Sequence, residues 1–220
     1  MFNRRALLRY IPVALITSMY LGLAGPLHAQ GALDDFVLDV VNDRVGAVTR
    51  ALQRGVDPNT VDRNGDPVLV IAARAGNLAT VEALVQARAD VNRANAFGDR
   101  PIMVAALNGH AEIVRLLSAR GAAVDGPGWT PLIYAATGGH DDIVRYLLER
   151  GANINGASPN GTTALMMAVR ESRSSTVNLL LERGADANRR NETGATALAW
   201  AQRNDDRALI ETLRRAGARP

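Results

Sequence analysis

Few side chains of this 220-residue chain could carry catalytic chemistry. The chain has no cysteine, all 25 of its basic residues are arginine, and it contains three histidines. Without cysteine there is no thiol nucleophile, no disulfide and no thiolate metal ligand. Without lysine there is no amine for a Schiff base and no phosphate-loop lysine. The composition therefore favours a protein that is not an enzyme and that needs no cofactor or metal.

Two histidines and three pairs of aspartates are the remaining candidates for chemistry. His110 and His140 each follow a glycine, and no third residue stands at a metal-ligand spacing from them. We expect each to form a hydrogen bond to a neighbouring loop, the alternative being a metal or catalytic role. The pairs Asp34–Asp35, Asp141–Asp142 and Asp205–Asp206 lie near predicted helix starts, where carboxylates commonly cap backbone amides.

Glycines at near-constant spacing reveal the elements that carry these side chains. Gly65, Gly98, Gly128, Gly161 and Gly194 are separated by 33, 30, 33 and 33 residues. Each opens a similar stretch, of which the fullest is GWTPLIYAATGGHDDIVRYLLERGANIN. A period of this length is typical of an array of stacked supersecondary units.

The local chemistry of that stretch predicts two short helices. Thr130 and Pro131 are typical of a helix start, and Gly138–Gly139 of a helix end. A second apolar stripe, from Ile143 to Leu148, has helical spacing and stops at Gly151. Because two short helices cannot bury both stripes alone, copies must stack into a solenoid.

The stretch resembles the ankyrin repeat, with its T-P-L start, G-H centre and L-L-x-x-G-A-x-x-N end. The resemblance implies an all-α fold, a solenoid of helix–turn–helix units joined by short β-hairpin or loop fingers. It covers essentially residues 32–219. We divide the ankyrin-repeat domain, residues 30–220, into an N-terminal cap at 32–64, repeats at 65–97, 98–127, 128–160 and 161–193, and a C-terminal cap at 194–220.

Three departures from the ankyrin pattern stand out. The histidine that usually follows T-P-L is replaced in every copy by an apolar residue. Arg88 occupies a slot that is glycine in the other copies, and we expect it to adopt a left-handed backbone at a cost of about 1 kcal/mol. The finger between the third and fourth copies, which includes Asp125 to Gly128, is three residues shorter than the others.

The family resemblance also implies a binding face. In ankyrin arrays the finger tips and the exposed side of the first helices form a concave surface that usually binds a protein. Carried onto this sequence, these positions are Arg63, Asn64, Asp66, Arg74, Phe97, Asp99, Leu107, Asn108, Trp129, Thr137, Asn160, Arg170 and Glu171. Phe97 and Trp129 have no packing role in the repeat, which favours an interface hot spot. Alternatively, Trp129 folds over the short finger as a structural lid.

The N-terminus predicts export. Residues 1–29 hold three arginines and no acidic residue, an apolar core at Val13–Leu23, and a small-residue end at Ala29. This is the pattern of a cleaved signal peptide, and Arg4–Arg5 also resembles a twin-arginine motif. An uncleaved membrane anchor is the alternative. Cleavage would leave 22 arginines against 22 acidic residues, which argues against nucleic-acid binding.

The sequence thus predicts a periplasmic or secreted monomer that binds a protein partner without catalysis, and that has no membrane contact after signal cleavage. One role is to dock or stabilise a periplasmic enzyme. The alternatives are a secreted effector that acts on a host protein, or an enzyme of unknown type.

Overall fold

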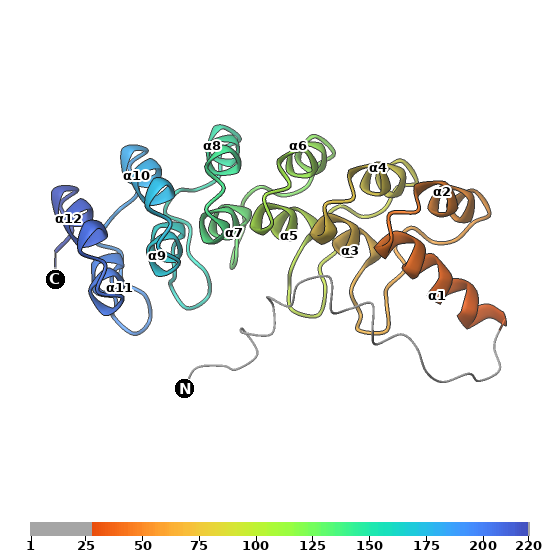
Figure 1. Cartoon of the computed structure of the whole chain (residues 1–220), viewed down its shortest axis with the longest axis horizontal. Helices are drawn as coiled ribbons and strands as arrows, with labels where there is room; N and C mark the ends of the chain where they lie inside the picture. Colours follow the sequence, from red (N-terminus) through yellow and green to blue (C-terminus); the bar gives the residue numbers. More distant parts are fainter. Residues whose placement is uncertain (1–27, 220) are drawn as a thin grey trace.

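The computed structural model describes residues 28–219 and folds them into twelve α-helices. The helices form six antiparallel pairs stacked side by side, with the first helices in one row and the second helices in another (Figure 1). The first helices are α1 (His28–Val41), α3 (Val68–Ala75), α5 (Pro101–Leu107), α7 (Pro131–Gly138), α9 (Ala164–Arg170) and α11 (Ala197–Arg203). The second helices are α2 (Val45–Gln53), α4 (Leu78–Gln86), α6 (Ala111–Ala119), α8 (Asp141–Glu149), α10 (Ser174–Glu182) and α12 (Arg207–Arg215). The predicted all-α solenoid is confirmed.

The helix ends are set by local capping. The hydroxyl of Thr130 accepts a hydrogen bond from the Ile133 amide at 3.3 Å and starts α7. Thr163 and Thr196 start α9 and α11 in the same way. Gly139, with φ of 83°, ends α7 in the left-handed conformation that glycine adopts at little cost.

The core runs continuously between the two rows of helices. Ala105, Ala135, Ala136 and Ala168 have no exposed surface, and their small side chains let neighbouring first helices approach closely. The slot of the missing family histidine is filled mainly by apolar packing. Val70, Met103, Ile133 and Met166 are buried there, and Ala199 is half-buried.

Polar side chains tie each repeat to the one before it. His140 Nε2 lies 2.9 Å from the carbonyl oxygen of Leu107, and His110 Nε2 lies 3.2 Å from that of Arg74. Both histidines therefore bond the end of the preceding first helix, whereas the sequence predicted a bond to a loop. Asn77, Arg173 and Asn204 donate to Val40, Thr137 and Arg170 in a corresponding way.

The three aspartate pairs do not share one role. Asp206 caps α12 by accepting from the Leu209 amide at 3.0 Å, as predicted. Asp141 lies in the first turn of α8, but its carboxylate accepts from two hydroxyls of the next repeat, Ser175 and Thr176. For Asp34–Asp35 the prediction is wrong, because both residues lie well inside α1.

Arg88 adopts φ of 68°, so the predicted left-handed backbone is confirmed. The glycines in the corresponding slot of the other repeats have φ between 88° and 93°, or 86° at the C-terminal end. Arg88 thus carries a conformational cost that glycine avoids.

Five fingers join the helix pairs: the first at residues 54–67, the second at 87–100, the third at 120–130, the fourth at 150–163 and the fifth at 183–196. They extend on the side of the first helices, and the third is visibly the shortest (Figure 1). Single antiparallel bridges, Val61 with Pro67 and Ala157 with Thr163, close the first and fourth fingers. The fingers are therefore minimal hairpins or loops, as the resemblance implied.

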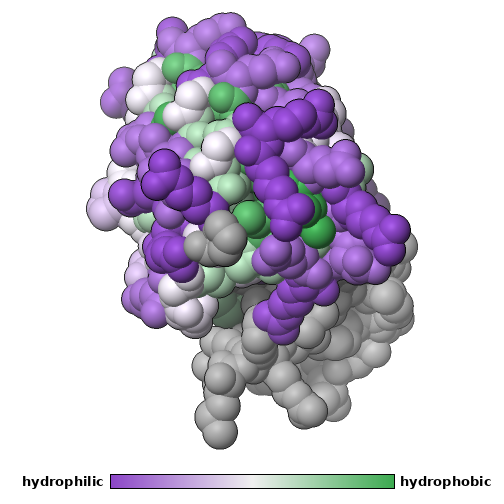
Figure 2. Space-filling view, turned by 90° about the vertical axis from the view of Figure 1, so that its left-hand side faces the viewer, coloured by the Kyte–Doolittle hydropathy of each residue, from purple (hydrophilic) through white to green (hydrophobic). Residues whose placement is uncertain are grey.

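The two ends of the array differ. Figure 2 views the C-terminal end, where mostly hydrophilic residues cover the surface. At the other end, α1 begins at His28, two residues before the predicted mature N-terminus. The signal peptide prediction lies, up to residue 27, outside the described residues. Within residues 28–219, none of the helices has the length and apolar character needed to cross a membrane.

Candidate protein-binding face

A short polar side chain organises the backbone of four of the five fingers. In the first finger, Asp62 Oδ1 accepts from the amides of Asn64 and Asp66, both at 2.8 Å. In the second, Asn95 Oδ1 accepts from the amides of Phe97 and Asp99 at 3.0 and 2.9 Å. Ser158 and Asn191 have the same place in the fourth and fifth fingers, whereas the shortened third finger lacks this turn.

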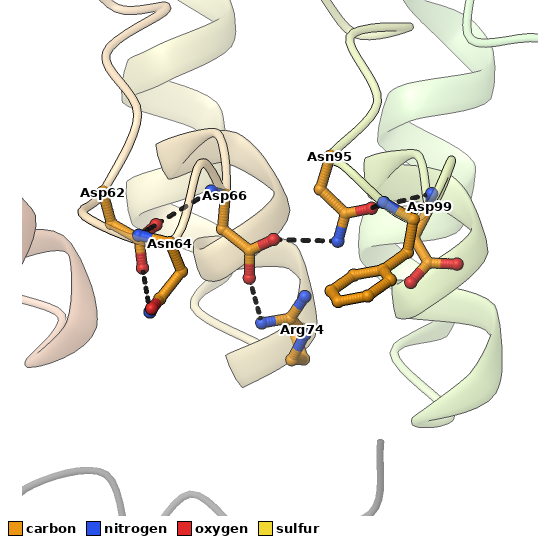
Figure 3. A network of polar contacts seen from close by, with 7 residues as sticks. Asp62, Asn64, Asp66, Arg74, Asn95 and Asp99 are labelled. Carbon is orange, nitrogen blue, oxygen red and sulfur yellow. Dashed lines mark hydrogen bonds and ion pairs between the residues drawn. The ribbon is translucent and has the colours of Figure 1, made fainter. Parts of the chain in front are cut away.

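The first two fingers are also joined to each other (Figure 3). Asp66 Oδ1 accepts from Asn95 Nδ2 at 2.8 Å, so its carboxylate connects neighbouring repeats. Asp66 Oδ2 forms an ion pair with Arg74 at 2.8 Å, at the end of the first helix of its own repeat. We call Asp66, Arg74, Asn95, Asp99 and Tyr134 the finger network.

Tyr134 links the second finger to the following repeat. Its hydroxyl donates to Asp99 Oδ1, and the Tyr134 ring is buried in α7. Asn95 and Asp99 are each only 7% exposed. A buried carboxylate or amide is costly unless its hydrogen bonds are made, and here they are. The finger network therefore fixes the second finger against repeats on both of its sides.

The side chain displayed by this fixed finger is an aromatic ring. Phe97 is 64% exposed, more than the other large apolar side chains that are exposed in the described residues, Leu33 and Val61. Val61 belongs to the adjacent first finger. An aromatic ring held on a rigid support contacts a partner with little loss of conformational entropy.

Trp129, in the shortened third finger, has a different environment. It follows Gly128 as Asp99 follows Gly98, but it is half-buried and packs against the core. Its ring meets Tyr134 edge to face, with centroids 6.0 Å apart and an interplanar angle of 82°. This geometry favours the lid alternative over a hot spot.

The remaining predicted face residues divide by exposure. Arg63, Asn64, Asn108, Asn160 and Arg170 are exposed, whereas Asp66, Arg74, Leu107 and Glu171 are half-buried. Arg63 pairs with Asp34, and Arg170 pairs with Glu171 at 2.9 Å.

For Asp99 and Thr137 the expectation of an exposed position is wrong. Asp99 is drawn into the finger network. Thr137 is 6% exposed, and its hydroxyl donates to the Ile133 carbonyl at 2.7 Å. A short side chain that bonds its own helix stays close to the backbone, so Thr137 does not reach the surface.

Sequence reasoning missed two members of the finger network. Asn95 stands three residues before Gly98, as Asp62 does before Gly65, and this spacing could have revealed the turn wherever the residue two positions on has an amide. Asp125 has the same spacing from Gly128, but Pro127 has no amide to donate. Tyr134 is buried in α7, and the partner of its hydroxyl comes from another repeat and left no local signal.

No group of three or more histidine, aspartate or glutamate side chains suited to a metal ion occurs within residues 28–219. Each candidate histidine is already bonded to a backbone carbonyl.

Comparison with known proteins agrees with the repeat architecture. A family model described as ankyrin repeats (3 copies) matches residues 39–127, 69–157, 122–191 and 155–220. The chain belongs to the ankyrin-repeat family. The human ASB11 ankyrin repeat domain has a similar solved structure, with a TM-score of 0.77, 28% sequence identity and 84% of each chain covered.

Two curated proteins share parts of this ankyrin-repeat sequence. Alpha-latrocrustotoxin-Lt1a of Latrodectus tredecimguttatus is 38% identical over 90 residues, which are 40% of this chain and 6% of the toxin. YahD of Escherichia coli (strain K12), described as an ankyrin repeat protein, is 30% identical over 83 residues, 38% of this chain and 41% of YahD. The matches thus span less than half of either relative.

Proposed function

We propose that this protein is an exported, non-catalytic scaffold that binds another protein through its finger side. Ankyrin repeats are generally protein-interaction scaffolds. The observation that carries the proposal is Phe97, a largely exposed aromatic ring on a finger held from both sides.

The rigidity of the second finger matters as much as the ring. Ordering a loop on binding costs free energy, and a finger whose turn and base are already bonded avoids most of that cost. The surrounding face supplies exposed polar groups such as Asn64 and Asn108, the composition expected of an interface rim.

Capture of a partner from the protein's own periplasmic extract tests this function. We expect the wild-type chain to enrich a specific protein, and Phe97→Ala to weaken that capture about tenfold or more. Leu33→Ala is the matched control, because Leu33 is another exposed apolar side chain but lies on α1. If both variants lost capture of the partner equally, the association would be nonspecific and hydrophobic, and the proposed face would be wrong.

The proposed role is to dock or stabilise a folded periplasmic enzyme. Binding to the folded form alone raises the apparent stability of a partner with the concentration of the scaffold. We therefore expect the captured enzyme to melt at a higher temperature when the scaffold is added. If the melting temperature of the enzyme did not change, the scaffold would dock the enzyme without stabilising it.

Export rests on the arginine-rich, apolar and small-residue pattern of residues 1–29. We expect mass spectrometry of the native protein to find an N-terminus near Gln30 in the periplasmic fraction. A chain that keeps residues 1–29 in a membrane fraction would overturn export by cleavage. Recovery in the culture medium would favour the secreted-effector alternative.

A further inference from the structure

We propose that the second finger binds a linear, acidic segment of its partner, in which an apolar side chain is flanked by carboxylates. This inference rests on the proposed function and adds the chemistry of the partner. Phe97 would contact the apolar side chain, and Arg93 and Arg100 would contact the flanking carboxylates.

The acidic groups around Phe97 are already engaged within the protein. Asp62 accepts from two amides of its own finger. Asp66 is held by Arg74 and Asn95, and Asp99 by the Tyr134 hydroxyl. Arg74 balances the charge of Asp66. Asp62 and Asp99 keep their negative charge, but their hydrogen bonds lie within the protein, and neither forms an ion pair with Arg93 or Arg100.

The two arginines of the second finger have no such acidic partner. Arg93 stands four residues before Phe97 and is exposed, and its Nη1 donates to the Asn59 carbonyl at 2.7 Å. Arg100 stands three residues after Phe97 and is half-buried. Within residues 28–219, neither guanidinium group has a carboxylate oxygen within 4.0 Å.

In this respect Arg93 and Arg100 differ from three arginines of the predicted face. Arg63, Arg74 and Arg170 lie on the same predicted face, and each forms an ion pair with a carboxylate of this chain. The protein neutralises those three arginines itself, whereas Arg93 and Arg100, which precede and follow Phe97 in the second finger, remain able to bind carboxylates from outside.

The short third finger borders this site. The guanidinium group of Arg100 lies close to Gly126, since a Cβ atom added at Gly126 would be 3.7 Å from Arg100 Nη2. Gly126 and Pro127 are exposed, and the third finger lacks the tip that its neighbours carry. The partner segment can therefore approach Arg100 from the side of the third finger.

Charge-assisted hydrogen bonds from guanidinium to carboxylate are directional and frequently bidentate, so they would fix the register of an extended segment around the ring. Because both arginines are at least partly exposed to solvent, these bonds should weaken as salt concentration rises.

Selection from a phage library of random 12-residue peptides tests the proposal even while the natural partner is unidentified. The purified wild-type chain is the bait, and the dissociation constants of selected synthetic peptides are measured at low and high salt. The variants are Phe97→Ala, the double variant Arg93→Gln/Arg100→Gln, and the control double variant Arg214→Gln/Arg215→Gln. The control removes the same charge from exposed positions on α12. Circular dichroism checks that each variant is folded.

We expect the selected peptides to carry an apolar residue next to aspartate or glutamate. Phe97→Ala and Arg93→Gln/Arg100→Gln should each weaken binding about tenfold, or about 1.4 kcal/mol, whereas the control should change it less than about twofold. High salt should weaken wild-type binding and have little effect on the Arg93→Gln/Arg100→Gln variant.

Other outcomes separate the two proposals. The acidic-segment inference would be overturned by selected peptides without acidic residues, or by binding that survives Arg93→Gln/Arg100→Gln. In either case, weaker binding by Phe97→Ala would still support the proposed face. Binding insensitive to Phe97→Ala would overturn the face itself. If no peptide is selected, the inference of a linear segment is wrong, and capture of a folded partner remains the test of the proposed function.

Discussion

The second and third fingers fill one structural position with opposite chemistry. After the finger glycine, the second finger has Asp99, which is buried by a hydrogen bond to the Tyr134 hydroxyl. The third finger has Trp129, which packs against the edge of the same tyrosine. The longer finger has an Asn95 turn and displays Phe97, whereas the shorter one has lost the turn and covers its own base.

Position in the finger and finger length both differ between the two aromatic residues: Phe97 precedes its finger glycine and is exposed, whereas Trp129 follows its glycine, at the position of the buried Asp99. A finger with its full turn satisfies its polar groups internally and holds its tip away from the helices. With three residues fewer, the chain returns at once to the helices, and a large ring then has apolar surface within reach.

The largest effect is expected when the support of the second finger is removed. Asp99→Ala would leave the buried Tyr134 hydroxyl without its acceptor and should lower the free energy of unfolding by about 3 kcal/mol. Unfolding in denaturant measures this loss of free energy. The control is Asp142→Ala, which removes an exposed carboxylate of α8. If both variants lose the same small amount, the finger network does not support the second finger.

Trp129→Ala should have the next largest effect on stability. Loss of a half-buried ring and of its edge-to-face contact should cost about 2 kcal/mol. Peptide or partner binding that depends on Phe97 should persist. A variant with unchanged melting temperature but lost binding would instead make Trp129 the hot spot and reverse the roles of the two fingers.

Arg88→Gly should stabilise the protein by about 1 kcal/mol, because glycine has no side-chain penalty at φ near 68°. Arg88→Ala keeps the penalty and serves as the control, with a change near zero expected. Thermal unfolding of the two variants separates backbone strain from the loss of the arginine side chain. A lower midpoint for Arg88→Gly would show that the side chain stabilises the array.

Lengthening the third finger should affect stability least. Three residues, Asn-Gly-Ser, inserted after Asp125 add less than about 0.6 kcal/mol of loop entropy. If the gap beside Arg100 admits the partner segment, peptide binding should nevertheless weaken. Insertion of the same residues after Asn188 in the fifth finger is the control for binding and for unfolding in denaturant. Equal binding by both variants would show that the short finger is not part of the site.

Much of the fold could be predicted because its signals are local. The threonine cap of α7, its glycine end and the left-handed slot of Arg88 each depend on a few consecutive residues. The short third finger is visible in the glycine spacing alone. The site was less predictable. Phe97 is exposed as a finger-tip residue should be, but Thr137 occupies a surface position of the repeat and is buried.

Short-range sterics and hydrogen bonds fix the period, the helix pairs, the finger lengths and the left-handed slot of Arg88, so these features could be predicted from the sequence. Which finger carboxylates are buried depends instead on contacts between repeats, since the hydrogen bonds between Asp66 and Asn95 and between Asp99 and Tyr134 join residues 29 and 35 positions apart. Such contacts depend on how one repeat is rotated and placed on the next. That geometry arises from packing of the whole interface between repeats, and no short stretch of the sequence encodes it.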